Sequence, residues 1–158
     1  MNLTLILLMI GIGVIAGLRS MTPPAVVSWA VHLGWINLSN TRLAPIGTTL
    51  AVVVLTILAL GELVADKLPF TPNRTAPGPL IGRIVTGGLC GAAVGVAGGG
   101  SLGAGVTLGA VGAVAGAFGG YQVRHRLVNG AGLPDLVVAL AEDLVAVGGA
   151  FAIVMFLR

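Results

Sequence analysis

The chain has 158 residues, of which 56% are hydrophobic and only 8% are charged, and its mean hydropathy is +1.07. This composition leaves too little polar surface to coat a water-soluble globule, so the excess apolar surface must face lipid and an integral membrane protein is expected. Eight Lys and Arg against five Asp and Glu are too few for a nucleic-acid footprint, so no nucleic-acid partner is expected.

Six apolar segments follow one another along the chain, at about 3–18, 24–38, 45–65, 80–98, 102–121 and 135–157. The first lacks a positive leader and a small-residue cleavage site, so we expect a retained helix rather than a signal peptide. The second is short and either crosses the membrane or turns back as a re-entrant segment. The pattern predicts one all-α transmembrane bundle over residues 1–158, with about six transmembrane helices.

The basic residues favour six crossings. If the second segment crosses, six basic residues fall on one side and two on the other; if it turns back, the division is five against three. The larger bias fits the positive-inside rule and places both termini outside the cytoplasm, with the connector at 67–83 inside. The six are Arg19, Lys67, Arg74, Arg83, Arg124 and Arg126, and the two are Arg42 and Arg158. Trp35 then falls near the outer interface.

Glycines recur every four residues in the fourth and fifth segments. Such ribbons let helix backbones approach closely, which predicts Gly-zipper packing of these two helices, within the bundle or between protomers. A narrow pore or sliding surface is the functional alternative. The ribbons are Gly87, Gly91, Gly95 and Gly99, then Gly105 and Gly109, then Gly112, Gly116 and Gly120. Cys90 lies in this region and is expected to be a small buried packing residue.

The stretch GLRSMTPPA at 17–25 ends the first apolar run and starts the second. We expect Thr22 to cap the second helix, because prolines at 23 and 24 suit a first helical turn. The N–H groups at that helix start then lie beside Arg19 and Ser20, with Arg83 at the same depth. This cluster suits an anion or a lipid phosphate. Alternatively, the arginines reach the headgroups or pair with acids inside the bundle.

Four carboxylates lie at the depth of these arginines. Glu62 and Asp66 share one face of the third helix, and Glu142 with Asp143 follows two turns into the last helix. Buried carboxylates need a partner or a proton, so structural pairing and a role in ligand binding or transport both stay open. We expect Arg19 to share a pocket with Glu62 and with Glu142 or Asp143. The candidate ligand-binding residues are Arg19, Ser20, Thr22, Glu62, Asp66, Arg83, Glu142 and Asp143.

Four stretches together carry a family resemblance: GLRSMTPPA, GELVADKLP, the connector TPNRTAPGPLIGR, and AEDLVA in the last helix. They resemble a family of small bacterial multi-pass membrane proteins catalogued only as a domain of unknown function. The resemblance spans nearly the whole chain. It implies a bacterial membrane protein without an assigned reaction, and it transfers no site residue.

The motifs of enzymes are absent from the sequence, which has no nucleophile–base spacing, no metal-ligand cluster and no cofactor loop. We therefore expect no enzyme activity, cofactor or metal. The first functional hypothesis is a small inner-membrane transporter or channel-like protein whose cytoplasmic-side charge cluster binds an ion, an anionic solute or a lipid phosphate. The alternative is a non-transporting scaffold that oligomerises through its Gly-rich helices. Membrane lipids and further copies of the chain are the expected partners.

Overall fold

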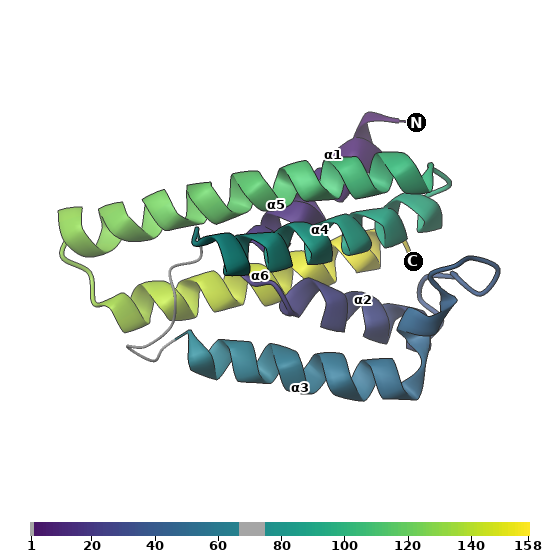
Figure 1. Cartoon of the computed structure of the whole chain (residues 1–158), viewed down its shortest axis with the longest axis horizontal. Coiled ribbons are helices and arrows are strands. Elements are labelled where there is room, and N and C mark those ends of the chain that lie inside the picture. Colours follow the sequence, from purple (N-terminus) through teal and green to yellow (C-terminus); the bar gives the residue numbers. More distant parts are fainter. Residues whose placement is uncertain (1, 67–74) are drawn as a thin grey trace.

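The computed structural model describes residues 2–66 and 75–158, which form helices and connecting turns (Figure 1). The basic residues Lys67 and Arg74, and the first part of the predicted connector, lie outside the described residues. The elements are α1 (Leu3–Leu18), α2 (Thr22–His32), the 3-10 helix η1 (Ala44–Gly47), α3 (Thr49–Ala65), α4 (Pro77–Ala97), α5 (Leu102–His125), the π-helix η2 (Arg126–Gly130) and α6 (Asp135–Phe156). The predicted all-helical class is confirmed for the described residues.

Three helices in the described part of the chain are long and apolar enough to cross a membrane: α4, α5 with its continuation through η2, and α6. Helices α1 and α3 are apolar but shorter, with 16 and 17 residues. Helix α2 has 11 residues and is about 17 Å long at 1.5 Å per residue. A hydrocarbon core is about 30 Å thick, so α2 cannot cross it without the residues that follow.

Local sequence signals account for several helix ends. The side chains of Asn2, Thr48 and Ser101 accept hydrogen bonds from the first turns of α1, α3 and α5. Pro77 opens α4, where a missing N–H costs nothing. The turn from α4 to α5 passes through Gly99, whose φ of 76° lies in the left-handed region that glycine adopts without strain.

Helices α1, α4 and α5 form the most closely packed part of the bundle, because glycines bring their backbones together. A Cβ on Gly91 would lie 2.8 Å from Cα of Gly109. A Cβ on Gly17 of α1 would lie 2.7 Å from Cα of Gly116 on α5. Side chains larger than hydrogen are thus excluded at these crossings.

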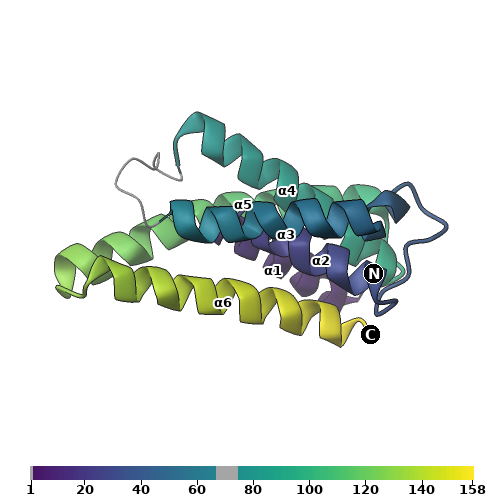
Figure 2. The same cartoon turned by 90° about the horizontal axis from the view of Figure 1, so that it is seen from below.

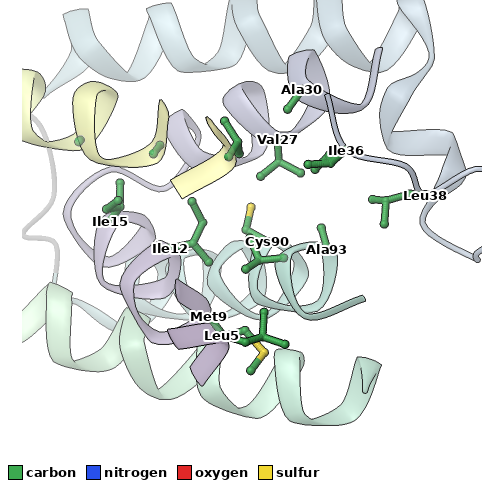
Figure 3. Packing of buried hydrophobic residues seen from close by; sticks show 14 residues of the cluster. Leu5, Met9, Ile12, Ile15, Val27, Ala30, Ile36, Leu38, Cys90 and Ala93 are labelled. Carbon is green, nitrogen blue, oxygen red and sulfur yellow. The ribbon is translucent and has the colours of Figure 1, made fainter. Parts of the chain in front are cut away.

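The apolar core lies where α1 and α4 meet α2 and α6 (Figure 3). Met9 and Ile12 of α1, Val27 of α2 and Cys90 of α4 are fully buried in it. The expectation that Cys90 is a buried packing residue is confirmed. Ile36 and Leu38, in the loop after α2, close the core at the end near the chain termini.

Helix α3 lies at the edge of the bundle, where it packs along α2 and against η1 (Figures 1 and 2). Large apolar side chains of α3 that do not face these elements point outward: Leu50, Ile57 and Val64 are 74%, 63% and 65% exposed. Large apolar side chains at this exposure along a whole helix face are typical of contact with lipid.

The two chain termini lie at the same end of the bundle (Figure 1). Near the C-terminus, Trp35 packs edge-to-face with Phe151, and the guanidinium carbon of Arg158 lies 5.7 Å from the Trp35 ring centroid. His32 is the last residue of α2, where Nδ1 is 3.0 Å from the carbonyl oxygen of Gly47. The 3-10 turn brings that carbonyl back over the end of α2.

Candidate functional site

The chain reverses direction between α1 and α2 inside the bundle, and α5 and α6 extend past this reversal (Figure 1). Arg19 ends α1 in an extended conformation, with its N–H donating to the carbonyl of Ile15 over 2.8 Å. Two residues later, α2 begins at Thr22. The reversal therefore brings the negative end of one helix dipole beside the positive end of another.

Glu62 of α3 occupies the positive end of α2. Its carboxylate accepts hydrogen bonds from the backbone N–H groups of Ser20 and Met21, each at 2.7 Å, and from the Ser20 hydroxyl at 3.0 Å. The side chain of Glu62 is only 12% exposed. The anion-binding position predicted at this helix start is thus filled by a carboxylate of the same chain.

The prediction that Thr22 caps α2 is wrong. Met21 stands at the cap position, and Thr22 is the first helical residue, with its buried hydroxyl lacking a hydrogen-bond partner among the described residues. A capping side chain normally accepts from the second or third helical N–H. For Thr22 as the cap those positions are Pro24, which has no N–H, and Ala25, whose N–H already donates to the carbonyl of Met21 over 3.1 Å. Glu62 instead binds the N–H groups that precede the helix.

Arg83 of α4 occupies the negative end of α1. Its Nη1 donates to the carbonyls of Gly17 and Leu18 at 2.8 and 2.7 Å, two acceptors that the helix itself leaves unsatisfied. Its Nη2 lies 3.9 Å from Oε1 of Glu62. Opposite charges from α4 and α3 thus neutralise the two helix ends at the reversal, and they are themselves within ion-pair distance.

Arg19 lies between two further carboxylates and is completely buried. Its Nη1 contacts Asp66 at the end of α3, and its Nη2 lies 2.6 Å from Oδ1 of Asp143 on α6. The two carboxylate side chains are 14% and 15% exposed. One guanidinium therefore ties together three helices, two of which, α3 and α6, lie on different sides of the bundle (Figure 2).

Glu142, a candidate for the Arg19 pocket, lies elsewhere. Its Oε2 is 3.4 Å from Nη1 of Arg124 on α5. The other Arg124 nitrogens, Nε and Nη2, donate to the two carboxylate oxygens of Asp135 at 2.8 and 2.7 Å. The sequence interpretation missed this second ion-pair group because it treated Arg124 only as a topology marker. The sequence signal that indicates this pair is an arginine and an aspartate 11 residues apart, on either side of the turn that joins two helices.

Six of the eight candidate residues come together. We call them the polar cluster: Arg19, Ser20, Glu62, Asp66, Arg83 and Asp143. Thr22 adjoins the cluster without bonding to it, and Glu142 belongs to the Arg124 group. No three His, Cys, Asp or Glu side chains within residues 2–66 and 75–158 are grouped so that they could hold a metal ion.

The chain belongs to the family described as Domain of unknown function (DUF4126), whose model matches residues 6–156. This match confirms the resemblance drawn from the sequence. No curated protein and no solved structure matches the chain.

Proposed function

We propose that the protein is a small multi-pass transporter or channel-like protein of the bacterial inner membrane, and that the polar cluster takes up a proton. The observation that carries the proposal is the sharing of Arg19 between Asp66 and Asp143. With Glu62 and Arg83, the cluster contains three carboxylates and two guanidinium groups. These side chains lie in nearly dry surroundings, where a carboxylate is costly to keep charged and a proton is readily exchanged.

Arg19 has two carboxylate partners, so a proton on Asp66 or Asp143 leaves the guanidinium paired with the other one. A metal ion fits less well, because Mg²⁺ and Ca²⁺ need about six oxygen ligands and the Arg19 guanidinium separates these carboxylates.

A purely structural network satisfies its buried donors. The Nε of Arg19 is buried without an acceptor among the described residues, which favours a cluster that exchanges partners. An anionic solute or lipid phosphate is less well supported, because it must displace Glu62 from the start of α2 and a carboxylate from Arg19.

The scaffold alternative rests on Gly-zipper packing and oligomerisation. Many ribbon glycines face other helices of the same chain, as Gly91 faces Gly109 and Gly116 faces Val14. These surfaces are already used within the protomer. Six crossings, both termini outside the cytoplasm, bound lipids and a homo-oligomeric state remain parts of the proposal, as does a Gly-zipper contact between α4 and α5.

The experiment is proton flux into vesicles that contain the purified protein and a trapped pH-sensitive dye, driven by a potassium diffusion potential. We expect flux through the wild type and a loss of about tenfold or more in Asp143→Asn, because removing an acid of this kind commonly costs a proton carrier most of its rate. Asp135→Asn is the matched control: it lies on the same helix, is 60% exposed and is outside the cluster.

Wild-type vesicles that leak no faster than empty ones would contradict the proposal and favour the scaffold. Proton flux through both Asp143→Asn and Asp66→Asn at the wild-type rate would contradict the proposal as well. Far-UV circular dichroism of each variant checks that the helices are intact before the rates are compared.

A further inference from the structure

The last turns of α5 stand beyond most of the bundle, at the end opposite to the chain termini (Figures 1 and 2). There Tyr121, Gln122, His125 and Arg126 line a hollow of about 260 Å³. Tyr121 and His125, like Gln122 and Arg126, are four residues apart, so the two pairs form adjoining rows on one side of the helix. All four side chains are exposed, and the ring centroids of Tyr121 and His125 lie 6.2 Å apart. The hollow is a polar surface built by a single helix.

The opposite side of this part of α5 faces α6. Gly120, Val123 and Leu127 line an apolar groove, to which α6 contributes Val138 and Glu142. Helix α6 therefore covers the apolar side of α5, and the polar hollow lies on the side that points away from α6.

The length of α5 places the hollow at the membrane surface. Leu102–Gly130 is one helical span of 29 residues, which is about 44 Å long at 1.5 Å per residue. A hydrocarbon core is about 30 Å thick and takes about 20 residues of helix, which from Leu102 end at Tyr121. A helix tilt of about 20° adds only one residue to this count. The hollow thus lies at the level of the lipid headgroups, where tyrosine is enriched.

The fixed charge of the hollow is positive. Arg126 forms no ion pair with the residues that the structure describes, and residues 67–74 contain no acid. The nearest acid along the chain, Asp135, is held by Arg124 through two hydrogen bonds of 2.7 and 2.8 Å. The Arg126 guanidinium therefore has donors for an external anion, and His125 adds a second positive charge whenever it is protonated.

We propose that this hollow binds the headgroup of an anionic phospholipid, with the lipid phosphate at the guanidinium of Arg126. The planar fork of a guanidinium matches two phosphate oxygens, and Tyr121 and Gln122 offer further hydrogen-bond donors in the same hollow. A zwitterionic lipid fits less well, because its headgroup brings a second cation beside Arg126.

A lipid is favoured over dissolved phosphate because of the exposure of the site. One exposed arginine binds a free anion weakly in water. A lipid is already held at this depth by the bilayer, so it loses less translational and rotational freedom on binding. At the start of α2, by contrast, the carboxylate of Glu62 already accepts the available N–H groups.

This inference rests on the proposed placement of the chain in the inner membrane and does not depend on proton uptake by the polar cluster. The cytoplasmic leaflet, where the proposed orientation puts the end of α5, is the one whose anionic lipids attract basic residues. The polar cluster and the hollow share no residue.

The test is native mass spectrometry of the full chain in detergent, titrated with phosphatidylglycerol or with phosphatidylethanolamine of the same acyl chains. We expect saturable binding of phosphatidylglycerol that is at least about fivefold tighter than binding of phosphatidylethanolamine. Arg126→Gln should weaken phosphatidylglycerol binding about fivefold, the factor expected for one interfacial basic residue. Arg42→Gln is the matched control, because Arg42 is also exposed but lies in the loop after α2, and it should bind as the wild type does.

Four results would overturn the proposal: no preference of the wild type for phosphatidylglycerol, equal binding by Arg126→Gln and Arg42→Gln, displacement of the lipid by excess inorganic phosphate, or loss of lipid binding in Asp143→Asn. The third would indicate a site for a free anion, and the fourth would place the lipid at the polar cluster. Proton flux is measured separately, so a chain that binds the lipid but carries no protons would contradict only the proposed function.

Discussion

Replacement of Arg19 by methionine tests whether the polar cluster holds the bundle together. Arg19→Met keeps an unbranched side chain of similar length, so it fills much of the buried space but leaves Asp66 and Asp143 without the guanidinium between them. Removing one partner of a buried ion pair costs about 3–5 kcal/mol. The two carboxylates are 14% and 15% exposed and can be partly hydrated. We therefore expect a loss near the lower limit, about 3 kcal/mol.

The matched variant is the triple substitution Arg19→Met, Asp66→Asn and Asp143→Asn, which removes the stranded charges as well. We expect it to recover at least half of the lost stability, because no charged carboxylate is then left at the place of the missing guanidinium, while Glu62 and Arg83 are unchanged. Denaturation in mixed detergent micelles measures the stability of both variants, and circular dichroism reports the loss of helix. Trp29 fluorescence follows the contact between α2 and α3, where its indole N–H donates to Thr56. A loss below about 1 kcal/mol in Arg19→Met, or no recovery in the triple variant, would refute the reasoning.

Two further predictions concern packing and topology. Gly109→Ala should lower stability by about 1–3 kcal/mol, because the added Cβ would overlap the carbonyl oxygen of Gly87; Gly119→Ala, which meets open space, should be neutral or stabilising in the same unfolding assay. Equal melting of the two variants would argue against the close contact. A cysteine at the exposed Asn129, in a Cys90→Ala background, should resist an impermeant thiol reagent added to intact cells and react after the membrane is opened. Labelling from outside would reverse the proposed orientation.

The sequence predicted the helices well, because the signals that start and stop a helix act within a few residues. The first apolar run was expected at 3–18 and forms α1 over Leu3–Leu18. The last was expected at 135–157 and forms α6 over Asp135–Phe156. The short second segment was placed at 24–38 but is helical only over Thr22–His32, because Gly34 adopts a φ of 71° that the helix cannot continue through.

The sequence also identified which charged residues carry the candidate site, but not how they pair. Arg19 was expected near Glu62 and near Glu142 or Asp143, and the structure selects Asp143, with Asp66 as the second partner. Consecutive residues on a helix point about 100° apart, so only one of the two α6 acids can face Arg19. Helix α6 is apolar on nearly all sides, and its pattern does not reveal which side faces α1.

Composition and local signals thus determined the class of protein, a helical bundle with an apolar outer surface, and the positions of its helices. They also identified residues 17–25 as the stretch where buried charges need partners. Tertiary structure alone decided that Glu62 rather than Thr22 binds the start of α2, that Arg83 binds the end of α1, and that Glu142 lines an apolar groove. Each of these depends on how helices far apart in sequence are rotated and shifted against one another. The glycine contacts set that arrangement, because the distance at which two backbones can pack is a property of both helices together.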